Sequence, residues 1–167
     1  MKLSKFSSFV VAAVMFLVCA VAPARAQWHN WSQGQRNNAI VSRALTQNGA
    51  YTGVQCKEWV QNVVYSASGG AVWLPLNQPN LYQWYPSPNV WAVPYCPSIY
   101  SASPGSVIQM KWNSTPHTAI VYSTTGSGMW WIDCNWNHDT RVTMHFVSYS
   151  QFMSATSNSF YTVYYVR

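Results

Sequence analysis

The stretch Gly53-Val54-Gln55-Cys56-Lys57-Glu58-Trp59-Val60 decides how the rest of the chain is interpreted, because it joins a glycine turn, a thiol and an apolar helical face. Apolar residues recur at helical spacing from Trp59 onward, which predicts a helix over roughly Gln55 to Ser66. Cys56 lies three residues before Trp59 and four before Val60, so it faces the same side of that helix. Backbone N–H groups and the positive helix end favour a thiolate there. The stretch therefore predicts a reactive cysteine at the edge of the core.

A second helix is predicted upstream of this stretch and an antiparallel sheet downstream. The apolar pattern predicts a helix from Gln35 to Asn48, ended by Gly49. After Pro104-Gly105 the chain is rich in β-branched and aromatic residues. The strands predicted there are Ser106 to Lys111, Thr118 to Ser123, Met129 to Cys134, Arg141 to Phe146 and Phe160 to Val166. Glycine and Asn-His-Asp turns connect the middle strands, and Ser148 is placed to cap a helical turn through Phe152.

These elements predict an α+β fold with N-terminal helices packed on a C-terminal antiparallel sheet of about five strands. Between the helices and the sheet, residues 71 to 104 hold seven of the nine prolines and show little periodicity. The many Trp and Tyr residues of this segment argue against disorder, which is normally poor in aromatic residues. We expect an ordered irregular loop along a substrate groove; the alternative is a loop that only covers hydrophobic core.

The N-terminal 26 residues have the pattern of a secretory signal peptide. Lys2 and Lys5 precede an apolar run that ends before Ala24-Arg25-Ala26, a small-x-small cleavage site. The run is too short for a comfortable membrane span, so we expect no stable membrane anchor after cleavage. The predicted organisation is a signal peptide over 1–26 and one domain over 27–167. The predicted location is the periplasm or the extracellular space.

The charge of the mature chain limits the possible partners. Removal of the predicted signal peptide leaves six basic and three acidic side chains, a net charge of +3. This small excess suits an acidic polymer such as a bacterial envelope. The basic residues form no stripe, so we expect no nucleic-acid partner. We expect a monomer.

The mature chain keeps three cysteines, an odd number for an oxidising compartment. One solution pairs Cys96 with Cys134 in a disulfide and leaves Cys56 free. The alternatives are three unpaired buried thiols or another pairing, because sequence does not fix connectivity.

The candidate catalytic groups are Cys56 as nucleophile, His117 as base, and Asp133 or Asn135 as the group that orients the histidine. A cysteine hydrolase needs these three functions within hydrogen-bond reach of one another. In a strand, Asp133 and Asn135 would share one face while Cys134 would point to the other. Both polar side chains would then approach His117 across the hairpin.

Four motifs in order resemble those of the CHAP family, the cysteine, histidine-dependent amidohydrolases/peptidases of the papain-like NlpC/P60 superfamily. They are the stretch from Gly53 to Val60, Pro104-Gly105-Ser106-Val107-Ile108, His117-Thr118-Ala119-Ile120-Val121 and Asp133-Cys134-Asn135-Trp136. The resemblance covers residues 35 to 167. It implies a papain-like fold, a cysteine nucleophile at Cys56, a base at His117 and an orienting group at Asp133, with Asn135 as an additional or alternative partner.

The function expected from this resemblance is that of a secreted peptidoglycan hydrolase. Its expected substrate is peptidoglycan or a muropeptide, in which it would cleave a stem-peptide amide or the N-acetylmuramoyl–L-alanine bond. The backbone N–H of Cys56 and the side chain of Gln55 are the expected oxyanion donors. The alternatives are a non-catalytic wall- or glycan-binding module and an exported antibacterial amidase effector. His138, Asp139 and His145 match no zinc spacing, so no metal and no cofactor is expected.

Overall fold

The computed structural model describes residues 27–74, 92–96, 98–158 and 161–167. The predicted signal peptide and residues 75–91 of the predicted loop lie outside this part of the chain. The helices include α2 (Gln33–Leu45), α3 (Cys56–Ala67) and α4 (Tyr149–Ala155), with a short 3₁₀ helix η1 (Ile99–Ser101). The strands are β1 (Ala92–Cys96), β2 (Val107–Trp112), β3 (Thr115–Thr124), β4 (Gly128–Cys134), β5 (Val142–Ser148) and β6 (Tyr161–Val166).

Capping side chains set where two of the helices begin. The Oγ of Ser32 accepts from the backbone N–H of Gln35, and the Gln35 side chain accepts in return from the Ser32 N–H. This capping box starts α2 two residues before the predicted Gln35. Ser148 forms the same arrangement with Gln151, so the predicted helical turn extends to α4. The sequence therefore placed α4 correctly but ended it three residues early, at Phe152 instead of Ala155.

The strands form one antiparallel sheet in the order β1-β6-β2-β3-β4-β5. Strands β2 to β5 follow one another as the predicted meander, and β6 returns across the sheet to pair with β2. The described residues thus contain six strands where about five were predicted. The fold class is α+β, as expected.

The additional strand, β1, lies inside the segment that was predicted to be irregular, which corrects that prediction. Pro94 in the middle of this segment argued against a strand, because proline donates no hydrogen bond. Among the described strands β1 lies at the edge of the sheet and pairs with β6, and its register shifts between Ala92 and Tyr95. An edge strand with an irregular register accommodates a proline that a central strand would exclude.

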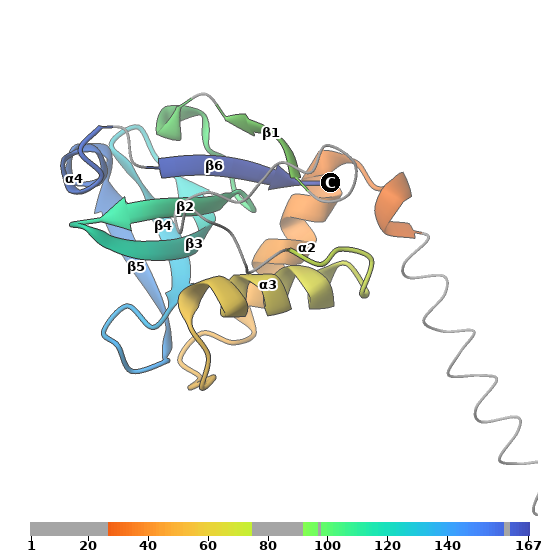
Figure 1. Cartoon of the computed structure of the whole chain (residues 1–167). Helices are drawn as coiled ribbons and strands as arrows, with labels where there is room; N and C mark the ends of the chain where they lie inside the picture. Colours follow the sequence, from red (N-terminus) through yellow and green to blue (C-terminus); the bar gives the residue numbers. More distant parts are fainter. Residues whose placement is uncertain (1–26, 75–91, 97, 159–160) are drawn as a thin grey trace, which may run out of the picture.

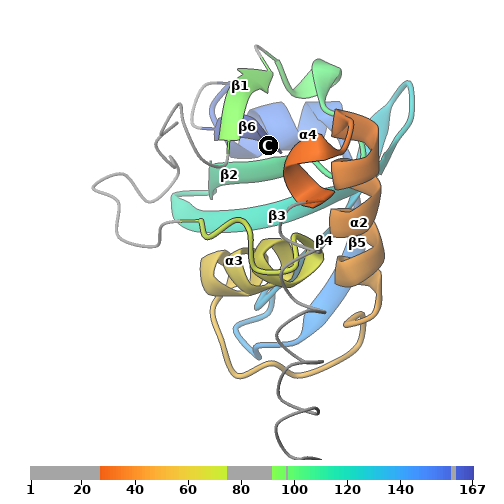
Figure 2. The ribbon, with the colours of Figure 1, turned by 90° about the vertical axis from the view of Figure 1, so that its right-hand side faces the viewer.

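The sheet separates two hydrophobic cores, one on each face. Helices α2 and α3 cover one face, and α4 covers the other (Figures 1 and 2). Trp59, Val60 and Val63 of α3 pack with Ile120 and Ile132 on the first face. The second face contains Ile108, Met110, Trp131, Phe152 and Val163. Because alternate residues of a strand point to opposite faces, β4 sends Ile132 and Cys134 toward α3 and Trp131 toward α4.

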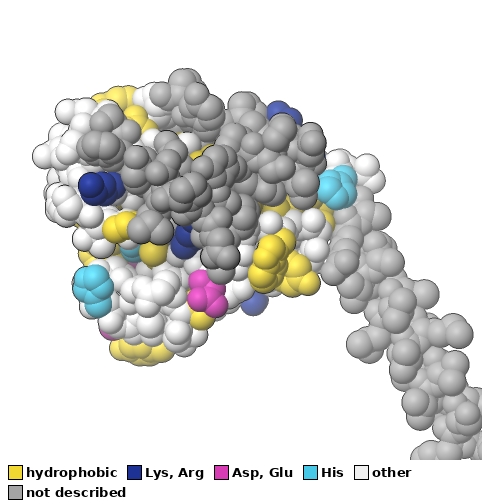
Figure 3. Space-filling model, in the orientation of Figure 1, with side chains coloured by type: hydrophobic (Ala, Val, Ile, Leu, Met, Phe, Trp, Pro, Cys, Tyr) yellow, Lys and Arg dark blue, Asp and Glu magenta, His cyan; other side chains and the backbone are white. Residues whose placement is uncertain are grey.

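Charged side chains are few among the coloured atoms of the surface that Figure 3 presents. The coloured Lys, Arg, Asp and Glu side chains stand apart from one another among neutral and hydrophobic ones. Within the described residues, no helix has the length and apolar character needed to cross a membrane.

Candidate active site

Cys56 is the first residue of α3. Gly53 has a φ of +73°, a conformation that favours glycine, and it turns the chain into the helix. Gln55 is the N-cap but makes no side-chain capping bond, so the N–H groups of the first helical turn are not capped by that side chain. The Cys56 thiol is half-buried and lines a cleft. This is the position predicted for a reactive cysteine.

His117 lies on β3 and joins Cys56 to Asp133 on β4. Its Nε2 donates to Oδ2 of Asp133 over 3.0 Å, and a hydrogen bond also links its ring to the Cys56 thiol. Because Nε2 is engaged with the carboxylate, Nδ1 is the nitrogen available to the thiol. His117 is 8% exposed and Asp133 is fully buried. The structure therefore brings together three residues that are 16 to 77 positions apart in the sequence.

Electrostatics favour a charged thiolate–imidazolium pair. Burial alone raises the pKa of Cys56, but hydrogen bonding to His117, the imidazolium charge and the backbone N–H groups of Thr118 and Lys57 lower that pKa below its ordinary value. Burial lowers the pKa of His117, yet Asp133 and Cys56 together raise it from 6.5 to about 9. Burial raises the pKa of Asp133, and hydrogen bonds from His117 and His145 bring it below its usual value.

Asn135, the other predicted partner of His117, has a different contact. It follows the last residue of β4 and has a φ of +67°, so the alternation expected from a continuous strand stops before it. Its Nδ2 donates to Oε1 of Gln55 over 2.6 Å, and its Oδ1 accepts from the backbone N–H of Thr140 over 2.9 Å. Asn135 thus lies in the cleft but fixes Gln55 rather than the imidazole. Asp133 is the partner that the structure gives to His117.

The residues around Cys56 and His117 enclose a cleft of about 230 Å³. It is lined by Gln55, Cys56, Trp112, Asn113, Thr115, Pro116, His117, Asn135, Trp136 and His138. Because Asn135 holds Oε1 of Gln55, the Nε2 amide of that side chain is its remaining donor. The predicted oxyanion donors, Gln55 and the backbone N–H of Cys56, therefore lie at the same cleft as the thiol and the imidazole.

Trp136 belongs to the last of the four motifs, but the sequence did not predict its contacts. The ring centroid of Trp136 lies 5.1 Å from that of His117 in an edge-on arrangement and 5.0 Å from that of His145. Trp112 contacts Trp136 at 5.3 Å. This aromatic cover lies beside the His117–Asp133 contact and limits access of water to it. The position of this tryptophan, two residues after Cys134, was its only signal in the sequence.

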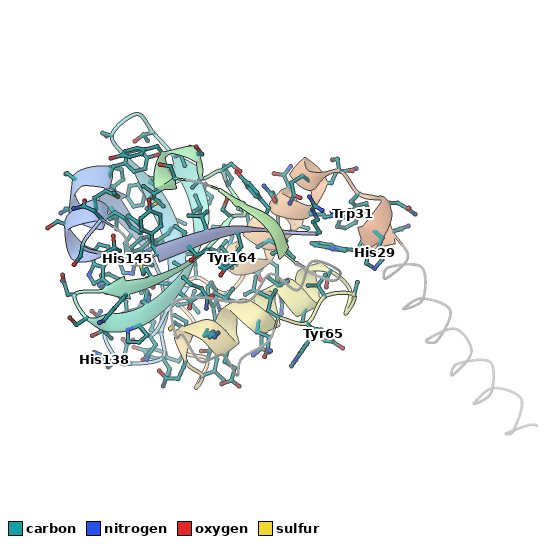
Figure 4. All side chains as sticks on the ribbon, turned by 45° about the horizontal axis from the view of Figure 1, so that its top comes forward. His29, Trp31, Tyr65, His138, His145 and Tyr164 are labelled. Carbon is teal, nitrogen blue, oxygen red and sulfur yellow. The ribbon has the colours of Figure 1, made fainter. Side chains whose placement is uncertain are left out.

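The sequence did not predict His145 as a site residue. The sequence offers it only as a possible zinc ligand, and its spacing from His138 and Asp139 matches no zinc site. Its Nε2 lies 3.1 Å from Oδ1 of Asp133. On β5, His145 pairs in register with Trp131, and Thr143 pairs with Asp133. The alternation of β5 places Thr143 and His145 on one face, beside the carboxylate. Figure 4 labels His145, which lies near α4, and His138, which lies at the rim of the molecule.

The structure corrects the predicted Cys96–Cys134 disulfide. Cys134 is a free, buried thiol whose Sγ lies 3.1 Å from Thr52 Oγ1 and within hydrogen-bond distance of the carbonyl oxygens of Val54 and Thr140, either of which can accept its proton. Strands β1 and β4 are separated by β6, β2 and β3. Four inter-strand spacings of ~4.8 Å place them roughly 19 Å apart, whereas a disulfide requires Cα atoms within about 7 Å. The two cysteines looked compatible because the sequence did not reveal the strand order.

Among the described residues, no group of three or more His, Cys, Asp and Glu side chains is arranged to hold a metal ion. The chemistry available in the cleft is that of a thiolate, an imidazolium and neighbouring amide donors.

Comparison with solved structures finds this fold in Ly7917. The crystal structure of Ly7917 has a TM-score of 0.54 and 13% sequence identity, over 76% of this chain and 61% of that protein. The structure of Ly7917 with the hydrolyzing product of MDP gives a TM-score of 0.55 and 13% identity, over 76% and 62%. This chain thus spans less than two thirds of the length of Ly7917, and at this identity the likeness establishes the fold. The sequence matches no protein-family model and no curated protein.

Proposed function

We propose that this protein is an exported peptidoglycan hydrolase of the CHAP type that cleaves an amide bond through Cys56. The observation that carries the proposal is the hydrogen-bonded series Cys56–His117–Asp133 beside one cleft, with the thiol at the first residue of a helix. The proposed bond is an amide of the stem peptide or the N-acetylmuramoyl–L-alanine amide.

The direction of the pKa shifts supports nucleophilic catalysis. A lowered pKa at Cys56 and a raised pKa at His117 increase the population of the thiolate–imidazolium pair near neutral pH. The thiolate attacks the amide carbon, and the carbonyl oxygen becomes an oxyanion. His117 then gives its proton to the amine as the C–N bond breaks, which leaves a thioester on Cys56.

Hydrolysis of the thioester regenerates the enzyme. Neutral His117 takes a proton from water, the hydroxyl attacks the thioester carbon, and the carboxyl product leaves as the C–S bond breaks. The backbone N–H of Cys56 and Nε2 of Gln55 are the proposed donors to the oxyanion in both steps. Asp133 holds His117 in the tautomer that keeps Nδ1 directed at the sulfur throughout.

The likeness to Ly7917 supports the proposed substrate class. One of the two Ly7917 structures holds the hydrolyzing product of MDP, which is a peptidoglycan fragment. The shared fold makes peptidoglycan the first substrate to test. The small positive charge of the mature chain and the aromatic and amide side chains that line the cleft agree with a substrate of this kind.

The proposal is tested by digesting purified sacculi with the protein, with Cys56→Ala and with Cys134→Ser. Cys134 is the matched control, because it is also a free thiol, it lies outside the cleft, and serine retains its hydrogen bonds. We expect release of fragments by the native protein and Cys134→Ser, and none by Cys56→Ala. Mass spectrometry of the products should show new amino groups. Equal release by Cys56→Ala, or new reducing sugar ends, would overturn the proposal.

A further inference from the structure

The buried carboxylate of Asp133 has two oxygens, and the catalytic series uses only Oδ2. The other oxygen, Oδ1, lies 3.1 Å from Nε2 of His145 and accepts from the hydroxyl of Thr143 over 3.3 Å. Thr143 Oγ1 and His145 Nε2 are also 2.8 Å apart. An anion removed from water requires donors at each oxygen, and here β5 supplies both donors to Oδ1.

The protonation of these groups follows from the chemistry of the carboxylate. Asp133 is ionised, since its pKa lies below the usual value, and an ionised carboxylate only accepts hydrogen bonds. Nε2 of His145 must therefore carry a proton, whether the ring is neutral or charged. Thr143 Oγ1 donates to the same oxygen and can share the Nε2 proton as an acceptor. Thr143 and His145 thus both bind Oδ1 of Asp133 from the β5 side.

The orientation of the carboxylate depends on these contacts. With Oδ1 fixed by two donors from β5, rotation of the carboxylate is opposed and Oδ2 remains directed at His117. Trp136 contacts both histidine rings, so movement of His145 would also disturb the cover beside His117. The side chain of His145 is 23% exposed and borders an adjoining hollow beside α4, and it is not among the residues that line the cleft containing Cys56.

We propose that His145 is a positioning residue of the active site: together with Thr143 it locks the Asp133 carboxylate, and through Asp133 it fixes His117 against Cys56. This inference rests on the proposed function for its kinetic consequence but not for its structural one. The hydrogen-bonded series then contains four side chains in the order Cys56, His117, Asp133 and His145. The last of these acts through Asp133 and does not touch the substrate.

Three variants distinguish the effect of the hydrogen-bond donors to Asp133 from the effect of the size of the His145 side chain. His145→Phe retains a ring but removes the donor, His145→Gln retains an N–H donor, and Thr143→Val removes only the hydroxyl. We expect His145→Phe to lower kcat on a muropeptide roughly 10- to 100-fold with KM within about twofold, as a small displacement of a catalytic group does. His145→Gln should recover most of that loss, and Thr143→Val should show a smaller decrease in kcat than His145→Phe.

Two readouts do not need catalytic activity. The first is the ¹H–¹⁵N NMR signal of the His117 Nε2–H, whose hydrogen bond to Asp133 should give a low-field resonance. The second is the rate of Cys56 alkylation by iodoacetamide near neutral pH. In His145→Phe the resonance should broaden or move upfield and alkylation should slow, while His145→Gln should resemble the native protein. Melting curves and far-UV circular dichroism confirm that each variant is folded.

The result that would overturn the inference is a folded His145→Phe with an unchanged His117 resonance and alkylation rate. Equal losses in His145→Gln and His145→Phe would also overturn it, because the donor would then be irrelevant. If His145→Phe does not fold, the same two readouts on Thr143→Val decide: an unchanged resonance and rate would count against the inference. A further outcome is that the native protein cleaves no muropeptide while His145→Phe still changes both the His117 resonance and the alkylation rate of Cys56. That result would overturn the proposed function and support the positioning role of His145.

Discussion

Nε2 of His117 donates to Oδ2 of Asp133 over 3.0 Å, and this contact joins β3 to β4 around a carboxylate that is fully buried. The contact fixes which ring nitrogen faces Cys56. It also couples the protonation of three groups, so substitutions at any one of them should change the titration of the others.

The first prediction concerns the reactivity of Cys56. Iodoacetamide should label Cys56 with an apparent pKa below the ordinary thiol value of about 8.5, because His117 and the helix N–H groups stabilise the thiolate. Cys134 should react slowly at every pH, since it is buried and burial raises its pKa. Labelling followed by peptide mass spectrometry measures each site separately. An unreactive Cys56 would indicate a binding module rather than an enzyme.

The second prediction concerns Asp133→Asn, which keeps the shape of the side chain and removes its charge. The pKa of His117 should fall and that of Cys56 should rise, because the anion that stabilises the imidazolium is lost. We expect kcat/KM to decrease by at least about 100-fold, the usual scale for loss of acid–base function. Steady-state kinetics and the alkylation profile measure the two effects. An unaltered thiol titration would show that Asp133 does not act through His117.

The third prediction concerns the pH dependence of stability in Cys56→Ala, where the thiol no longer titrates with His117. Burial lowers the pKa of His117 and Asp133 raises it. Because Asp133 remains in this variant, we expect the folded-state pKa of His117 to stay above the unfolded value of 6.5. The resulting stability is present in full below pH 6.5 and is lost as the pH rises through the higher folded-state pKa. Each unit of difference corresponds to about 1.4 kcal/mol. Urea denaturation from pH 6 to 10 should show this decrease, and the double variant with His117→Gln should not.

The fourth prediction separates two roles of Asn135. Its side chain holds Gln55, and its backbone has a positive φ that costs energy for most residues. Asn135→Gly and Asn135→Ala should lower kcat to a similar extent, because both release Gln55. Asn135→Ala should lose roughly 1 kcal/mol more stability, the cost of a left-handed alanine. If both variants retain the native kcat, the anchoring of Gln55 does not contribute to catalysis.

The fifth prediction concerns the turn before β2. Gly105 has a φ of +82°, and a Cβ at this position would lie 2.5 Å from the Cα of Asn37 on α2. Gly105→Ala should lower the free energy of unfolding by about 2–4 kcal/mol, through strain and a backbone clash. Gly34→Ala is the control: a Cβ added there would have no atom within 4 Å, and alanine should stabilise α2 by up to about 1 kcal/mol. Equal melting temperatures for the two variants would contradict this account.

Local patterns in the sequence predicted much of the fold. The apolar spacing after Cys56 gave α3 within one residue at each end, and Ser148 gave the start of α4. The alternation of β4 correctly separated Asp133 from Cys134. The long segment after α3 was expected to be irregular, and Pro94 concealed the edge strand β1. Helix capping, hydrophobic periodicity and the effect of proline all act over a few residues. They therefore predicted local elements such as α3 and α4, but not the pairing of β1 with the distant strand β6.

The sequence by itself determined that a thiol would open a helix and that an imidazole and a carboxylate would lie on neighbouring strands. It did not determine whether Asp133 or Asn135 would reach His117, whether Cys134 would pair with Cys96, or that His145 would join the site. Those outcomes depend on strand order and register: β5 places Thr143 and His145 against Asp133, and three strands separate β1 from β4. Contacts between distant strands are selected by burial on both faces of the sheet at once, so only the tertiary structure decided them.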